Sequence, residues 1–484
     1  MTRRAGLVRL CLLEGRILFR DPALWILCLL LAGLTTVAWR TTKVGLAEQG
    51  RLTGVLLHEE RLRLAGIQER AARERDDLLA KGQPLSPVLF GSRHATTIGH
   101  YSGGRWMTLP ALPTGSLAMG ERDLQPLGYL ASVDRWQGQK ESQFSSPLWQ
   151  RMVRFDVQFV AAYLLPLAII VLCAGAVASE RERGTLSLHR AHGSSGIRLG
   201  IGRGLVRTGI LVMGVVVSAW GLMALDGVAD AYGSMRLGGW VAGLVCYAAF
   251  WLGAMAVIDS YVPSVKGNLL TGLVAWVIVL FLLPALVTLL ADVMHPVRSR
   301  ADVERQRRQA YQDTWSLSND EVLTAFYASH PEIPPSRDAR GGLERYAIYQ
   351  MRLLELMRER LLAVESGFEE TAERRRRLLG VVRFASPVLL LQDITTWAAG
   401  THGDRFAEFR RQREQFLEKW DRFYITRIYS REPIENLAET PVFTFQEPLV
   451  RDTVAGPAWS CLGLLGAALG LLGWASVRFR HQPL

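Results

Sequence analysis

Histidine and acidic residues occur throughout this chain, but their spacing does not form a known catalytic or metal-binding motif. A run that begins at His58 starts like the helix of a zinc protease, yet Leu62 stands where the second histidine ligand is required. His94 and His100 flank a loop and could bind a metal together, although a pair of exposed loop histidines more often binds nothing. No G-x-x-x-x-G-K-S/T sequence occurs, so we expect no ATP hydrolysis in this chain. Because no cluster of histidines or carboxylates is marked by its spacing, we also expect no catalytic residue and no metal.

The charged residues and cysteines point to no ligand by themselves. The formal net charge of +11 could indicate nucleic acid, but the basic residues do not form an aromatic-interleaved patch, and basic cytoplasmic edges of a membrane protein explain the sign as well. We therefore expect no nucleic-acid partner. Arg374 to Arg377 could bind an anionic partner, although such a run is more often the solvated face of a helix. The five cysteines lie in apolar segments without metal spacing, so we expect no disulfides.

The apolar residues concentrate in six blocks, each close to the roughly 20 residues that a membrane-spanning helix requires. The sequence predicts an all-α polytopic membrane protein with transmembrane helices over residues 23–40, 155–178, 205–225, 239–258, 268–291 and 456–477. Residues 1–22 are basic and carry leucines at helical spacing, which predicts an interfacial elbow helix at the surface of the lipid bilayer.

Two long polar inserts, residues 41–154 and 292–455, separate these blocks and predict a mainly helical domain outside the membrane. Residues 41–80 read as one helix with an apolar face that requires a neighbouring helix or a second subunit; this face is Leu52, Val55, Leu56, Leu62 and Ile67. In the second insert, an aromatic stripe at helical spacing is interpreted as packing before any ligand site: Phe406, Phe409, Phe416, Trp420 and Phe423.

The last predicted span carries four glycines that permit close approach of another helix: Gly463, Gly466, Gly470 and Gly473.

The orientation of the chain in the membrane follows from the short segments that connect the predicted spans. Those on the side of the two termini carry many arginines, whereas residues 226–237 on the other side carry Arg236 alone. The positive-inside rule therefore places both termini and residues 179–204 in the cytoplasm, and the two inserts on the opposite side.

The second predicted span contains Pro166 and no charge, and it ends in an alternating-charge turn. The run SERERGTLSLHRA, which starts at Ser179, resembles the first cytoplasmic loop of the type-2 ABC transporter permeases, in which a span ends in a Glu-x-Glu/Arg-x-Gly-Thr-Leu pattern. By itself the run would be read as a solvated loop with a stop-transfer charge cluster. The S-P at position 146 and the F-D at position 155 resemble a subfamily with large extracytoplasmic inserts, related to the nitrous-oxide-reductase maturation permease.

The resemblance implies the permease subunit of an ABC transporter in the bacterial inner membrane, with periplasmic inserts and with export as the expected direction. Its implied partners are two copies of a separate ATPase subunit, which would bind ATP and Mg, and a second permease copy or a related permease. Residues 179–204 would form a coupling loop, and the residues implied at the ATPase contact are Glu180, Glu182, Arg183, Gly184, Thr185 and Leu186. Few ionisable groups occur in the predicted spans, which argues against proton coupling.

Two other functions stay open. The spans could relay cytoplasmic ATP hydrolysis to the outer domain and do mechanical work on a periplasmic partner without passing a substrate, which the scarcity of polar residues in the spans mildly favours. A signalling receptor with an extracytoplasmic ligand domain is the other function. It requires a cytoplasmic effector segment, and the predicted cytoplasmic segments are too short to be one.

Overall fold

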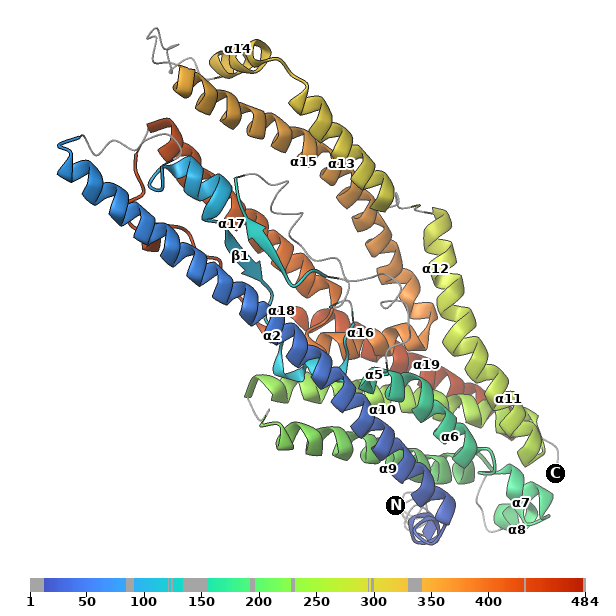
Figure 1. Cartoon of the computed structure of the whole chain (residues 1–484). Helices are drawn as coiled ribbons and strands as arrows, with labels where there is room; N and C mark the ends of the chain where they lie inside the picture. Colours follow the sequence, from blue (N-terminus) through green and yellow to red (C-terminus); the bar gives the residue numbers. More distant parts are fainter. Residues whose placement is uncertain are drawn as a thin grey trace.

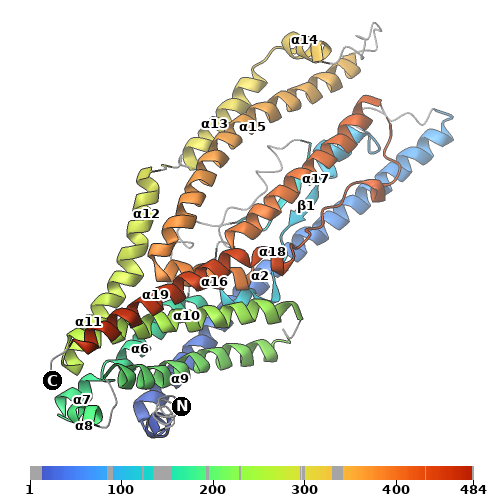
Figure 2. The same ribbon diagram turned by 180° about the vertical axis from the view of Figure 1, so that it is seen from behind.

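The computed structural model of the chain describes residues 13–83, 91–120, 122, 125–133, 155–191, 196–227, 231–294, 296, 300–329, 342–430 and 432–481. In this part of the chain, six helical segments are long and apolar enough to cross a membrane, which confirms the predicted helical architecture. They form a bundle from which two sets of outer helices extend (Figures 1 and 2). Most of the predicted elbow helix lies outside the described residues; residues 13–18 are helical.

In chain order, the elements of the spans are α2 (Pro22–Ala80), α5 (Val157–Phe159), η4 (Val160–Leu164), α6 (Leu165–Cys173), α7 (Ala178–Glu182), α9 (Gly196–Leu225), α10 (Ala231–Tyr261), α11 (Val265–Val277), η5 (Ile278–Leu282), α12 (Leu283–Met294) and α19 (Ala455–Arg480). α8 (Leu186–Ala191) follows the second span. Segments α5 to α7 make up the second span and segments α11 to α12 the fifth.

The first span continues into the first insert without a break. α2 is a single helix of 59 residues, about 90 Å long at 1.5 Å per residue. It starts where the Asp21 side chain accepts a hydrogen bond from the Ala23 amide (2.9 Å) and Pro22 takes the first helical position. The predicted boundary between the first span and the first insert, at Arg40, is therefore not a helix end. A charged residue can mark the edge of the lipid, but it does not end a helix.

The outer half of α2 buries a face that differs in part from the predicted one. Leu64 and Ile67 are buried against the outer domain, whereas Val55 is 41% exposed and Leu62 is 61% exposed. At 100° per residue, Val55 and Leu62 lie about 120° and about 140° around the helix from Ile67, at the other edge of the apolar stripe. Within this chain the outer domain therefore covers the Ile67 edge of the predicted face but not the edge of Val55 and Leu62, and cover of that edge by a second subunit stays a prediction.

The second and fifth spans each contain a π-helical turn that ends two residues before a proline. η4 precedes Pro166, and η5 precedes Pro284. A proline has no amide hydrogen, so the carbonyl four residues earlier loses its helical partner. In the second span this carbonyl belongs to Ala162, and it accepts a hydrogen bond from the Tyr247 hydroxyl instead (2.9 Å). The proline thus ties the second span to α10.

The inserts form two sets of elements at the same end of the bundle. One set lies along the outer half of α2 (Figure 1) and consists of η1 (Thr97–Ser102), β1 (Arg105–Thr108), η2 (Pro113–Leu117), β2 (Gly128–Ala131), α17 (Gly403–Ser430) and η7 (Leu437–Glu439). The other set is α13 (Arg300–Trp315), α14 (Asn319–Ser329) and α15 (Gly342–Val382). β1 and β2 are an antiparallel pair in which Arg105 lies opposite Ala131, and this small sheet is the exception to the all-α prediction in the described chain.

The aromatic stripe of α17 is core packing, as predicted. Phe409, Phe416 and Trp420 are buried, and they pack with Tyr424 and with Phe443 from the chain after η7. The ring centroids of Phe416 and Phe443 are 5.4 Å apart, and those of Trp420 and Tyr424 are 4.6 Å apart. Phe406 is also buried and Phe423 is half-buried.

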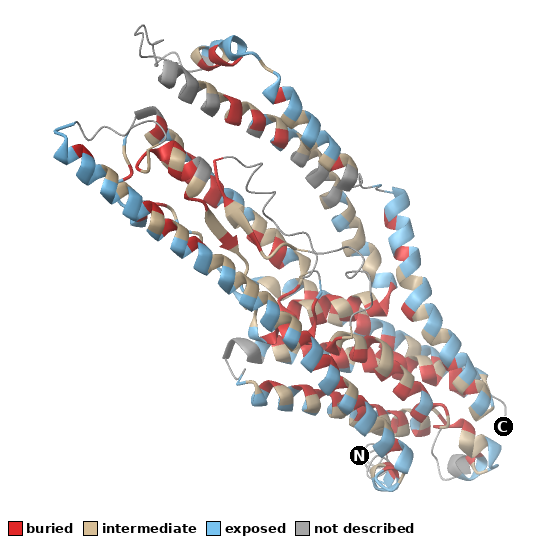
Figure 3. Cartoon of the chain, viewed as in Figure 1, coloured by how far each residue is buried: buried red, intermediate tan, exposed pale blue. Residues whose placement is uncertain are grey.

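A short helix joins the outer elements to the spans. α16 (Pro387–Ala399) follows η6 (Arg383–Ala385) and precedes α17, and α18 (Val450–Thr453) leads into α19. A Cβ on Gly239 would lie 2.6 Å from the Trp397 ring, and one on Gly243 would lie 2.7 Å from Ile394, so α16 packs directly on the backbone of α10. Ser460 of α19 also donates a hydrogen bond to Asp393 (2.5 Å). Buried residues accordingly concentrate where α16 meets the spans (Figure 3).

The two faces of α2 make a direct test of this packing. We expect Ile67→Ala to lower the free energy of unfolding of the outer domain by about 2–5 kcal/mol, because it leaves a cavity in the core. Leu62→Ala is the matched control on the exposed face, with an expected change below about 0.5 kcal/mol. Denaturant unfolding followed by tryptophan fluorescence measures both, and equal losses would place Leu62 on the packed face after all.

Candidate functional site

The predicted coupling loop is a short helical hairpin, α7 and α8, at the end of the second span. It lies at the same end of the bundle as the start of α2 and the end of α19 (Figure 1). The second span reaches it through a break. α6 ends at Cys173, four residues form a turn, and α7 begins at Ala178. The predicted continuous span over residues 155–178 is therefore interrupted before its end.

Two buried polar side chains fill this break. The Asn268 amide of α11 donates a hydrogen bond to the Ala174 carbonyl (3.0 Å) and another to the Asp259 carboxylate of α10. Asp259 in turn accepts from the backbone amides of Val177 and Ala178 at the start of α7. A carbonyl at the end of α6 and amides at the start of α7 thus have partners, as an interrupted helix in a membrane requires.

The charged end of α7 holds the link between the fourth and fifth spans. The Glu182 carboxylate accepts a hydrogen bond from the amide of Val265, the first residue of α11 (2.9 Å). Arg181 donates to the carbonyls of Asp259 (3.4 Å) and Val262 (3.2 Å) at the end of α10. An acidic group at the start of one helix and a basic group at the end of another both suit the helix dipoles. α7, α10 and α11 are joined at this point.

A chain of four charged side chains joins α7 to α9 and to the helical residues before α2. Arg203 contacts Glu180 (2.9 Å) and Glu14 (3.2 Å), and Arg207 contacts Glu14 (2.6 Å). None of the four side chains is more than 18% exposed. Both arginines also donate to backbone carbonyls of the second span. Two carboxylates therefore balance two guanidinium groups, which limits the penalty for removing these charges from water.

The turn between α7 and α8 is fixed from the inside. Gly184 has φ +74°, a left-handed conformation that a side chain rarely adopts, so the turn favours glycine. The Thr185 hydroxyl donates a hydrogen bond to the Glu180 carboxylate. Leu186 is buried in a small apolar cluster with Val177 and Phe479. Three of the six predicted coupling residues, Glu180, Thr185 and Leu186, thus point toward the bundle.

The tip and outer side of the loop are exposed. Glu182, Arg183 and Gly184 are exposed, and Leu188 on α8 is 60% exposed. The loop therefore has a packed inner side and an exposed outer side that carries charges of both signs and an apolar residue.

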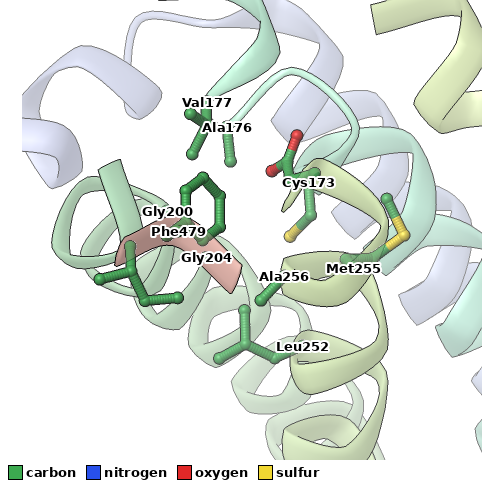
Figure 4. Close-up of a pocket in the computed structure, with 11 residues that line it drawn as sticks. Cys173, Ala176, Val177, Gly200, Gly204, Leu252, Met255, Ala256 and Phe479 are labelled. Carbon is green, nitrogen blue, oxygen red and sulfur yellow. The ribbon is translucent and has the colours of Figure 1, made fainter. Parts of the chain in front are cut away.

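Only a small space remains behind the loop. Cys173, Val177, Gly204 and Phe479 line a cavity of about 10 Å³ (Figure 4), enough for at most one water molecule. A Cβ on Gly204 would lie 2.2 Å from the Leu252 side chain, so α9 and α10 are in close contact there. The inner side of the loop is a packed contact rather than a ligand cavity.

The four glycines predicted to allow close helix approach have different surroundings. A Cβ on Gly463 would lie 2.9 Å from Phe384, so this glycine does pack closely. Gly466, Gly470 and Gly473 face open space within this chain, and their part in packing against a second subunit stays a prediction. The close approach of α19 to α10 depends instead on Gly253 of α10.

Other candidate residues have structural roles. His94 was predicted to be exposed, but it is buried. Its burial lowers the pKa of the ring below the ordinary value. Among the described residues, no three histidine, cysteine or acidic side chains lie close enough to hold a metal ion. Glu60, in the run that resembles a zinc-protease helix, accepts a hydrogen bond from the Trp106 amide of β1 (2.6 Å). Arg375 contacts Asp292 (2.6 Å), and Arg376 contacts Glu373 (3.0 Å).

Comparison with known families identifies one region of the chain. Residues 300–446 match a family model described as a domain of unknown function, DUF3526. The chain is a multi-pass membrane protein with a DUF3526 domain. This domain lies within the second insert, residues 292–455, and extends from α13 past η7. No curated protein and no solved structure matches the chain.

The DUF3526 domain is tied to the spans by a buried cluster of two arginines and a glutamate. Arg405 of α17 contacts Glu447 (2.8 Å), and Arg236 of α10 contacts the same carboxylate (3.6 Å). The two arginine side chains are only 5% and 4% exposed. Arg405 also donates to the Pro110 carbonyl of the first insert (2.9 Å), and Arg236 donates to the Trp397 carbonyl of α16 (2.5 Å). Both inserts and the fourth span therefore meet at Glu447.

Sequence reasoning missed the inner half of the coupling-loop site. By its bounds, Arg203 fell in the coupling loop at 179–204, Arg207 in the third span and Asp259 in the link after the fourth span, and Glu14 and Asn268 had no role. In the structure α9 begins at residue 196 and α10 extends to residue 261, so these side chains lie on helices that face the bundle. One signal was available: Arg203 and Arg207 are four residues apart and share one helix face.

Removing Glu14 tests the buried chain of ion pairs. Glu14→Ala leaves two buried guanidinium groups with one carboxylate, and we expect a loss of about 3–5 kcal/mol in the free energy of unfolding. Glu48→Ala is the control, because it removes an exposed carboxylate that pairs with Arg51, and we expect no measurable change. Denaturant unfolding in detergent measures both variants. A Glu14→Ala protein as stable as the control would show that these ion pairs contribute nothing to the free energy of unfolding.

Proposed function

We propose that this DUF3526 protein is the membrane-spanning subunit of a bacterial ABC transporter, and that the hairpin of α7 and α8 receives the movement of a separate ATPase subunit. The observation that carries the proposal is the asymmetry of this hairpin. Its inner side is bonded to α9, α10 and α11, and through Arg203 of α9 to Glu14 before α2, while its outer side is exposed. A displacement of the tip would therefore reach several spans at once.

The residues of the hairpin divide into two groups under this proposal. Arg183 and Leu188 face the partner, since both are exposed. Glu180 and Glu182 pass the movement inward, because they bond to α9 and to α11. Gly184 sets the turn between the two groups. The resemblance of this loop to that of the type-2 permeases supports an ABC ATPase as the partner, two copies of which would bind ATP and Mg²⁺.

The same proposal includes the surroundings of the chain. The protein lies in the inner membrane with its termini and the α7–α8 hairpin in the cytoplasm and the DUF3526 domain in the periplasm, as the arginine distribution of the short segments favours. A second copy of the chain, or a related permease, completes the transporter. Export of a substrate between the two permeases is the proposed activity.

A second candidate function keeps the ATPase but does without translocation. Two observations favour a protein that passes movement to a periplasmic partner. α2 runs as one helix from the membrane to the far end of the outer domain. Glu447 also connects α10 to both inserts through Arg236 and Arg405. Rigid connections of this kind would carry a displacement of the spans outward.

Substitution of the turn glycine tests the coupling role. We expect Gly184→Val to lower stimulated ATPase activity about tenfold in a complex with the proposed ABC ATPase partner, because a left-handed conformation costs a residue with a side chain on the order of 1–2 kcal/mol. Gly209→Val in α9 is the matched control, since Gly209 also has open space around it but lies inside a regular helix.

Co-purification and ATPase assays of the wild type and both variants give the result. A Gly184→Val complex with normal assembly and normal stimulation would contradict the coupling role of the hairpin. Failure of the wild type to bind any ABC ATPase would contradict the transporter proposal itself.

Neutralising Glu447 separates the two candidate functions. Spin labels at Glu418 of α17 and Leu362 of α15, both exposed, report the distance between the two sets of outer helices. Under the second function we expect ATP with vanadate to change this distance in the wild type and in the control Glu414→Gln, but not in Glu447→Gln. If ATP with vanadate does not change the distance between the two spin labels in the wild-type complex, the second function is contradicted and translocation is the proposed function that stands.

A further inference from the structure

The end of α15 lies at the depth of the membrane. The segments Glu373–Ala385 and Pro387–Ala399 meet at a bend of 119° and together are as long and apolar as a membrane span. Phe384 packs against Gly463, with 2.9 Å between its ring and a Cβ placed on the glycine. Gly463 is eight residues into α19, or about 12 Å along that span. Phe384 therefore lies below the level at which the sixth span begins.

One exposed face of α15 changes from basic to apolar within about one turn. Arg374, Arg377, Val381 and Phe384 follow one another at helical spacing on this face. The Arg377 side chain is 76% exposed, Val381 is 72% exposed and Phe384 is 44% exposed. Four residues correspond to about 6 Å along a helix. The basic residues therefore lie directly above exposed apolar residues.

The four arginines Arg374, Arg375, Arg376 and Arg377, which we call the basic collar, lie at the edge of the membrane. Arg375 contacts Asp292 (2.6 Å), which is two residues from the end of the fifth span. Glu373 contacts Arg376 (3.0 Å) and Arg377 (3.6 Å). The Arg376 and Arg377 side chains are still 43% and 76% exposed, so their guanidinium groups stay accessible to a further anion.

We infer that the basic collar binds the phosphate headgroups of acidic phospholipids in the leaflet on the side of the inserts. A guanidinium group binds phosphate through two parallel hydrogen bonds and stays charged at every physiological pH. The exposed Val381 and Phe384 lie where the acyl chains of the same lipids would be. A soluble anion would match the arginines but would leave the apolar residues below them without a partner. The inference goes beyond the proposed function and does not depend on any ATPase.

The collar anchors the DUF3526 domain to the membrane in this account. α15 ends at Val382, just beyond the collar, and the buried α16 begins after the bend. Headgroups bound at the collar would hold α15 at a fixed height relative to the spans. A basic cluster at a membrane surface acts in this way because each basic residue adds to the attraction for acidic lipid.

Lipid titration of the purified full chain in detergent tests the inference, with native mass spectrometry to count bound lipids. We expect the wild type to bind phosphatidylglycerol at least about tenfold more tightly than phosphatidylcholine. The variant Arg374→Gln/Arg376→Gln/Arg377→Gln should lose this preference; it retains Arg375 so that Asp292 keeps its partner. The control Arg61→Gln/Arg73→Gln/Arg75→Gln removes three exposed arginines from the outer half of α2 and should bind like the wild type.

Three results would overturn the inference: equal binding of both lipids by the wild type, an unchanged preference in the collar variant, or an equal loss in the control. Displacement of phosphatidylglycerol by an equal concentration of glycerol 3-phosphate would also overturn it, because the site would then belong to a soluble phosphate compound. If the glutamine variant unfolds, the variant Arg374→Lys/Arg376→Lys/Arg377→Lys tests the inference in its place. It keeps the charge and must keep the preference for phosphatidylglycerol.

Discussion

A helix inside a membrane can be interrupted only where protein groups replace the lost backbone hydrogen bonds, and the break in the second span depends on this constraint. Asn268 and Asp259 supply those groups, and they belong to the fifth and fourth spans. The position of α7 is therefore set by neighbouring helices. The ion chain through Glu14 and Arg203 adds the third span and the helical residues before α2. The hairpin that follows the break is a point where five parts of the membrane bundle meet.

The fourth span connects this point to the outer domain. α10 carries Asp259 at the hairpin end and Arg236 at the other end, 23 residues or about 35 Å apart. At the hairpin end it holds the break in the second span, and at the outer end it shares Glu447 with Arg405 of the DUF3526 domain. α16 packs on the glycines of the same helix. A displacement of the hairpin and a displacement of the outer domain are thus linked through one helix.

Patterns of apolar residues were sufficient to predict six spans, two large inserts and the aromatic core of α17, because lipid and core packing both act through hydrophobic burial. The same patterns did not locate the ends of helices, so Asp259 was assigned to a link although α10 extends past it. They also placed Val55 and Leu62 on the packed face of α2, whereas both side chains are exposed within this chain. A polar residue near the end of a span points into the bundle only where a partner residue faces it, and that partner can come from another span. Asp259, for example, accepts a hydrogen bond from Asn268 of the fifth span. Both π-helical turns, by contrast, could be anticipated from the prolines that follow them.

The central claim is that the exposed side of the α7–α8 hairpin contacts an ABC ATPase, and site-specific photo-crosslinking in cells tests it most directly. A photoreactive amino acid at Leu188, which is 60% exposed on α8, should form an adduct with an ABC ATPase of the same cell. The same amino acid at Leu225, 82% exposed at the opposite end of the third span, should form no such adduct. An adduct at Leu188 that mass spectrometry identifies as this ATPase would support the account. No ATPase adduct at Leu188, or equal adducts at both positions, would contradict it.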